Sequence, residues 1–209
     1  MDKEPVVFIV DDDAAVRDAI ERLVTSVALK SQCYSSAEDF LKEYDIDTPG
    51  CLILDVRMHG MSGLELQDWL IQNHSPIPVI VVTGHGDIPM AVELLKKGAF
   101  DIYEKPFRNQ TLLDCVMKAI KEDQEKRANL EVTRSLMDKY SSLTGREQEV
   151  ANYIIKGVAN KRIASELNLS PRTVETHRAN IMKKMGVRTS NRLLYALLQV
   201  AGPQSTTID

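Results

Sequence analysis

The chain has 209 residues, three cysteines, 44% hydrophobic and 27% charged residues, which suits two globular domains and argues against a disordered or disulfide-built protein. Its net charge of -4 hides an asymmetry: residues 1–122 carry 12 basic and 21 acidic side chains, whereas residues 123–209 carry 14 and 9. There is no apolar run of about 18 residues to form a membrane-spanning helix, and the charged start lacks a signal-peptide core, so we expect a cytoplasmic protein without membrane association.

Short apolar runs alternate with helical patterns through the first half of the chain. Four runs are typical of strands buried on both faces of a parallel sheet: residues 6–10, 51–54, 78–82 and 102–103. Residues 30–34 are expected to supply a fifth strand. Asp13 and Ser36 are placed to cap two of the intervening helices. The alternation predicts an α/β fold with a flavodoxin-like, doubly wound, five-stranded parallel sheet.

Helical periodicity resumes at Thr111 and continues without glycine or proline as far as Tyr140. Residues 121–127 are almost wholly charged, and two pairs of opposite charge stand four residues apart, Glu122 with Lys126 and Asp123 with Arg127. We therefore expect a partly exposed helical linker at 123–140 between domains at 1–122 and 141–209. A disordered linker is the alternative.

After Tyr140 the chain shows short helical segments without strand alternation. Thr144 with Glu147 three places on is a capping signature, and Pro171 suits the first turn of a helix. Between Lys156 and Arg192 there are 9 basic and 2 acidic residues, an excess that suits a polyanionic partner. The pattern predicts a small all-α helix-turn-helix domain.

The helix expected after Pro171 has two different faces. Val174, Ile181 and Met185 recur on one face and are expected in the core. Residues with basic, small or polar side chains occupy the opposite face: Arg172, Thr176, Ala179 and Lys183. Such a face fits a DNA major groove, because small side chains permit close approach and basic ones reach phosphates. An ordinary solvated face is the alternative.

Polar residues follow four of the apolar runs: Asp11 with Asp12, Asp55, Thr83 and Lys105. Ligands of doubly wound sheets bind beyond the carboxyl ends of the strands, so we expect these side chains to meet at one edge. Clustered carboxylates repel one another unless a cation compensates them, and oxygen ligands favour magnesium. The pattern indicates a phosphoryl-transfer site. Nucleotide hydrolysis is disfavoured, because the chain has no phosphate-binding loop of the G-x-x-x-x-G-K-[ST] type.

The motifs around this edge resemble the receiver domains of bacterial two-component response regulators: Val10-Asp11-Asp12, Leu54-Asp55, Val82-Thr83-Gly84 and Tyr103-x-Lys105-Pro106-Phe107. The stretch 83–91 is similar to the FixJ branch. The resemblance implies that Asp55 accepts phosphate from a sensor histidine kinase. It implies a magnesium ion, replaceable by Mn²⁺, held by Asp11, Asp12, Asp55 and the backbone carbonyl of Arg57. It also implies Thr83 and Lys105 as catalytic partners of the phosphoryl group, Thr83 and Tyr103 as a conformational switch, and a cis bond before Pro106.

One position departs from the resemblance. His59 stands where relatives usually have proline, in the loop beside the expected metal site. Loss of the proline is expected to loosen that loop. An extra ligand or proton partner is one interpretation of His59, and a solvated loop histidine is the favoured one.

The C-terminal motifs resemble the LuxR-type helix-turn-helix: Leu143-Thr144-Gly145-Arg146-Glu147, Asn160-Lys161-x-Ile163-Ala164 and Ser170-Pro171-Arg172-Thr173-Val174-x-x-His177. This resemblance implies base contacts from Glu175, Thr176 and Ala179. It implies phosphate contacts from the basic residues Lys161, Arg172, Arg178 and Lys183.

Together the two resemblances point to the NarL/FixJ family, and more narrowly to StyR-type regulators of aromatic catabolism. They imply a transcription factor that is phosphorylated on Asp55, dimerises when phosphorylated, binds promoter DNA and activates transcription with RNA polymerase. Its only chemistry would be self-phosphorylation and slow dephosphorylation, so it is not expected to be an enzyme in the usual sense.

Two other functions remain open at this point. A magnesium-dependent phosphatase would typically carry a second acid two places after the nucleophile, where this chain has Arg57. A ligand-sensing LuxR-type regulator would work without phosphorylation, and the acidic pocket argues against it.

Overall fold

A computed structural model of the chain describes residues 3–84 and 88–201. The chain divides into two compact units, residues 1–128 and 129–209. The sequence places the domain edges at 122 and 141 instead. Residues 85–87, within the FixJ-like stretch, and the tail after residue 201 lie outside the described residues.

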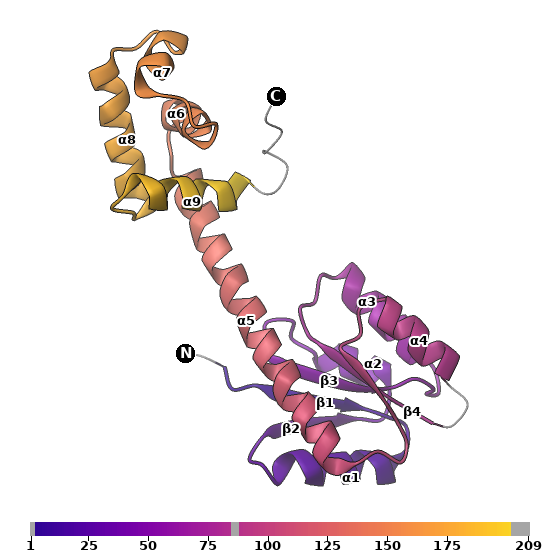
Figure 1. Ribbon diagram of the computed structural model, residues 1–209. Helices are drawn as coiled ribbons and strands as arrows, with labels where there is room; N and C mark the ends of the chain where they lie inside the picture. The colour runs from indigo at the N-terminus through magenta and orange to yellow at the C-terminus, as the bar shows by residue number, and fades with distance from the viewer. Residues whose placement is uncertain (1–2, 85–87, 202–209) are drawn as a thin grey trace. The chain divides into compact units, whose positions relative to one another are not determined.

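The first unit is built around a parallel sheet with the strand order β2-β1-β3-β4-β5 (Figure 1). Its strands are β1 Val6–Val10, β2 Lys30–Tyr34, β3 Gly50–Asp55, β4 Val79–Thr83 and β5 Asp101–Glu104. The helices between them are α1 Ala14–Thr25, α2 Ala37–Glu43, α3 Gly63–Gln72 and α4 Ile88–Lys96. Strand β1 pairs with both β2 and β3, so the strand order reverses there. The doubly wound fold and its fifth strand are confirmed.

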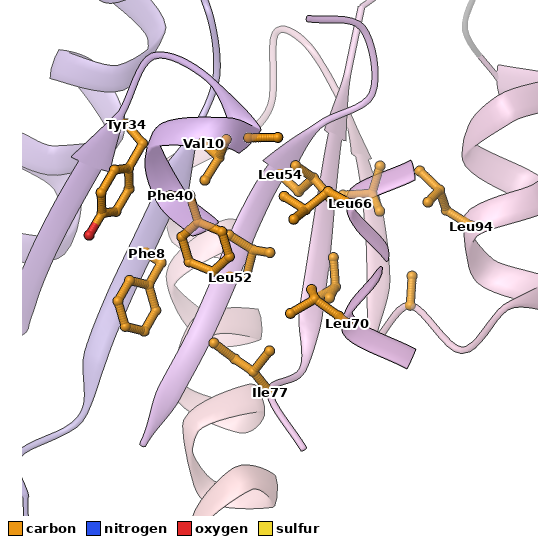
Figure 2. Close-up of a cluster of buried hydrophobic side chains, with 14 of the residues drawn as sticks. Phe8, Val10, Tyr34, Phe40, Leu52, Leu54, Leu66, Leu70, Ile77 and Leu94 are labelled. Carbon is orange, nitrogen blue, oxygen red and sulfur yellow. The ribbon is translucent and has the colours of Figure 1, made fainter. Parts of the chain in front are cut away.

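Strand alternation sorts the apolar side chains into two cores, one on each face of the sheet. On one face Phe8 and Leu54 pack with Phe40 of α2, Leu66 of α3 and Leu94 of α4 (Figure 2). On the other face the neighbouring strand residues pack against α1 and α5: Val7, Ile9, Ile53, Ile80 and Val82. Full burial of such a side chain contributes about 1.5–3 kcal/mol. Packing on both faces fixes the sheet in place. Because its strands are parallel, their carboxyl ends lie at the same edge.

Polar caps fix where the helices beyond that edge begin. The Asp13 side chain accepts from the Ala15 backbone N–H at 2.8 Å, and the Ser36 side chain accepts from the Asp39 N–H at 3.1 Å. Both caps confirm the sequence prediction. A reciprocal capping box between Ser62 and Glu65 starts α3. These caps therefore fix the points at which the loops of this edge end.

Helix α5 runs without interruption over Asn109–Ser141, so the stretch 123–140 lies wholly inside it. Its first turns bury Leu112, Val116 and Ala119 in the first unit. Within residues 3–84 and 88–201, no helix is both long and apolar enough to cross a membrane.

As far as residue 201, the second unit contains the end of α5 and four further helices: α6 Gly145–Ile155, α7 Asn160–Glu166, α8 Pro171–Met185 and α9 Ser190–Ala201. Thr144 and Glu147 form the predicted capping box at the start of α6. Val174, Ile181 and Met185 are all buried, which confirms the predicted core face of α8. Gly186 ends α8 with φ 70°, a left-handed conformation that glycine adopts without strain. These short helices around one core confirm the small all-α domain.

Candidate functional site

The side chains of Asp11, Asp55 and Lys105 meet at the carboxyl ends of the strands, and the Lys105 backbone N–H donates to the carbonyl of Thr83, the last residue of β4. Asp11, Asp55 and Thr83 are buried, with 2%, 7% and 0% of their surfaces exposed. The Lys105 ammonium donates to Asp11 Oδ2 at 2.6 Å and to Asp55 Oδ1 at 2.7 Å. The bond between Lys105 and Pro106 is cis, as expected from the resemblance. Residues nearly 100 positions apart are thus joined in one pocket.

Burial and ion pairing act in opposite directions on the pKa values of Asp55 and Lys105 in this pocket. Burial raises the pKa of Asp55, and the charge of Asp11 adds to that effect; the bonds from Lys105 only partly offset them. For Lys105, burial lowers the pKa, but the hydrogen bonds to Asp11 and Asp55 outweigh burial and raise it overall. The lysine therefore stays charged, and Asp55 is a stronger base than a surface aspartate.

The remaining oxygen of Asp55 is bonded as well. Its Oδ2 accepts from the Arg57 backbone N–H at 2.9 Å, so the loop after β3 is bonded to the carboxylate. Asp12 lies at the rim and is exposed, and its Oδ2 is 2.7 Å from His59 Nδ1. The His59 ring is wholly exposed, as expected for a loop histidine, yet it partners an expected metal ligand.

The oxygen donors of this pocket suit a hard cation that keeps water or phosphate ligands, rather than a metal ion held by protein ligands alone. Within residues 3–84 and 88–201, no three carboxylate, imidazole or thiol groups are arranged to hold an ion between them. Magnesium normally takes one or two carboxylates and fills its remaining positions with water and phosphate oxygens. The buried carboxylates Asp11 and Asp55 match that requirement.

The expected role of Tyr103 in a switch with Thr83 needs correction. The Tyr103 ring packs against the core beneath α1 and α5, whereas its neighbour Ile102 packs against the opposite core. Along β4, Val82 faces the same core as Tyr103, so Thr83 faces the side of Ile102. The Tyr103 hydroxyl donates to Asp101 Oδ2 at 2.9 Å. Tyr103 therefore cannot turn into space beside Thr83, and strand alternation alone would have indicated Ile102.

A second candidate site is the outer face of α8. The predicted DNA-contacting residues that are exposed there and on α7 are Arg172, Glu175, Thr176, Ala179, Lys183 and Lys161. Arg178 differs, because it is half-buried and its guanidinium donates to Asn160 Oδ1 at 3.2 Å. Arg178 is therefore partly committed to joining α8 to α7.

Two family models match the chain, one for each unit. The model described as "Response regulator receiver domain" matches residues 7–117, and that described as "Bacterial regulatory proteins, luxR family" matches residues 141–195. The response regulator protein TodT of Pseudomonas putida is 45% identical over 193 residues, covering 92% of this chain and 85% of TodT.

Another relative is the transcriptional regulatory protein FixJ of Bradyrhizobium diazoefficiens, 37% identical over 188 residues, covering 90% of this chain and 92% of FixJ. Among solved structures, the response regulator StyR is similar with a TM-score of 0.83 and 42% identity, over 93% of this chain and 98% of StyR. Full-length FixJ from B. japonicum is similar with a TM-score of 0.58 and 34% identity, over 96% of this chain and 98% of FixJ.

Proposed function

Because this chain belongs to the NarL/FixJ family of response regulators, which join a receiver domain to a LuxR-type DNA-binding domain, we propose that Asp55 is its phosphoacceptor. Family membership makes the protein a transcription regulator with a histidine kinase and DNA as partners, rather than a metabolic enzyme. Control of aromatic catabolism, which the resemblance to StyR-type regulators implies, is also part of the proposal.

The observation that carries the proposal is the Lys105 ammonium bridging Asp11 and Asp55. An oxygen of Asp55 attacks the phosphorus of the kinase's phosphohistidine; an O–P bond forms, the P–N bond breaks, and the ring leaves as neutral imidazole because its other nitrogen carries a proton. Lys105 then pairs with a phosphoryl oxygen, and the Thr83 hydroxyl donates to another. The chain's own chemistry is thus self-phosphorylation and slow dephosphorylation.

The proposed cofactor is Mg²⁺, with Mn²⁺ as a substitute. Asp11, Asp12, Asp55 and the Arg57 carbonyl would hold it. When bound, it neutralises charge on the transferring phosphoryl group. Before binding, Lys105 supplies the compensating positive charge to both buried carboxylates.

Phosphorylation is proposed to promote a homodimer through α4 and β5. Val92 and Leu95 of α4 are 41% and 42% exposed, which leaves apolar area for a partner. The dimer would present two copies of α8 to promoter DNA. The base contacts are assigned to Glu175, Thr176 and Ala179, and the phosphate contacts to Lys161, Arg172, Arg178 and Lys183. The regulator would act in the cytoplasm as an activator that engages RNA polymerase.

Labelling with acetyl phosphate and Mg²⁺ tests the phosphoacceptor. The wild-type chain is expected to gain one phosphoryl group, mapped by mass spectrometry to Asp55, and Asp55→Asn to gain none, because an amide lacks the attacking anionic oxygen. Asp47→Asn, at an exposed loop position, serves as the matched control. Undiminished labelling of Asp55→Asn would move the site, and multiple turnover of a phosphate monoester would favour a phosphatase instead.

A further inference from the structure

Two hydrogen bonds from one residue, His59, join two loops at the rim of the acidic pocket. Asp12 lies in the short loop between β1 and α1, and His59 lies in the loop between β3 and α3. His59 Nδ1 is 2.7 Å from Asp12 Oδ2, and the His59 backbone N–H donates to the same oxygen at 3.3 Å. The histidine thus offers two donors to one carboxylate oxygen.

The identity of the residue matters for this contact. An ionised carboxylate only accepts hydrogen bonds, so the ring nitrogen facing Asp12 must carry the hydrogen. Proline, the residue that relatives usually have here, has neither a backbone N–H nor a ring donor. His59 therefore makes two hydrogen bonds to Asp12 that a proline at the same position could not make.

The bound oxygen leaves the other one available. Both contacts fall on Oδ2, so Oδ1 can bind a cation, or a water on that cation, without breaking them. Lys105 bonds Asp11 and Asp55, whereas Asp12 is bonded by His59. Hydrogen-bond donors behind a metal-binding carboxylate commonly set its orientation and the affinity of the site.

We propose that His59 is a positioning residue that orients Asp12 for the divalent cation of the acidic pocket. The proposal rests on the cation site of the proposed function. Loss of such an outer contact typically weakens metal affinity about 10- to 100-fold. The His59 ring is wholly exposed, and exposed contacts contribute little, so we expect about a 3- to 10-fold weakening.

Titration of the full-length chain with Mg²⁺ alone, followed by calorimetry at one fixed pH, measures the effect. Mn²⁺ titration followed by electron paramagnetic resonance gives a second readout that needs no phosphorylation. His59→Ala is expected to bind both ions about 3- to 10-fold more weakly than wild type. His59→Asn should restore most of the affinity, because its amide nitrogen takes the place of Nδ1, whereas His59→Gln should not.

Two further variants separate orientation of Asp12 from a general effect. In an Asp12→Asn background, His59→Ala is expected to have no additional effect, because the group it orients is changed. His74→Asn, which removes another loop histidine at a left-handed position that asparagine tolerates, should bind Mg²⁺ like wild type.

The outcomes are distinct. Equal affinities for wild type and His59→Ala would overturn the role of His59 while leaving the cation site intact. Tighter binding by His59→Ala would also overturn it, because the ring would then compete with the cation. If wild type bound neither ion, the cation site of the proposed function and the role of His59 would both fail.

Discussion

Asp123 of α5 is a buried charge whose removal should destabilise the first unit strongly. It has 0% of its surface exposed, and its Oδ2 accepts from Arg127 Nε at 2.8 Å and from the Gly50 backbone N–H at 2.9 Å. Arg127 in turn donates to the Ile46 carbonyl at 2.8 Å. The pair therefore fastens α5 to the segment that enters β3.

Replacing Asp123 with alanine leaves the Arg127 guanidinium without its charge partner and the Gly50 N–H without an acceptor. Removing one member of a buried ion pair costs about 3–5 kcal/mol. We expect Asp123→Ala to lower the free energy of unfolding by about that amount. Urea denaturation followed by fluorescence measures it, because Trp69 is the only tryptophan and lies in the first unit.

The adjacent pair Glu122 and Lys126 is a matched control. Its atoms are 2.6 Å apart, but its side chains are 44% and 52% exposed. Glu122→Ala should therefore cost less than about 1 kcal/mol. The double variant Asp123→Leu with Arg127→Met should cost less than Asp123→Ala alone, since no unpaired charge remains. If Asp123→Ala were as mild as Glu122→Ala, the proposed anchoring of α5 would be refuted.

Three further predictions concern the acidic pocket, helix α8 and the ion pair between Glu147 and Lys184 in the second unit. Lys105→Ala should keep most Mg²⁺ affinity yet lose activation by acetyl phosphate; wild-type activation of DNA binding would contradict its role. Ala179→Leu should reduce operator affinity with little change in melting temperature, whereas Lys183→Ala should weaken binding to every duplex and lower the salt slope by about 1; both are measured by titration at several salt concentrations. The Lys184 hydrogen bond, partly offset by burial, lowers the pKa of Glu147 from 4.5. The bond between Lys184 and Glu147 therefore stabilises the second unit fully when the pH is above 4.5, the ordinary pKa of the carboxyl. This stabilisation is lost as the pH falls through the lowered pKa of Glu147. Lys184→Met should remove this part of the acid sensitivity in circular dichroism melts of the second unit.

Much of the fold and the acidic pocket followed from local patterns. Unbroken apolar runs marked the strands, and the parallel arrangement brought Asp11, Asp55 and Lys105 to one edge, because carboxyl ends of parallel strands share an edge. The core face of α8 followed in the same way from helical spacing. These features depend on periodicity, which is written in neighbouring residues.

The tertiary structure decided what periodicity leaves open. Asp123 and Arg127 look like an ordinary surface pair in the sequence, but Asp123 is buried against Gly50, 73 positions away. His59 meets Asp12 across 47 positions. Tyr103 turned out to face away from Thr83. Such contacts depend on how separate elements and loops pack together in three dimensions, and spacing along one segment carries no information about the side chain that arrives from another.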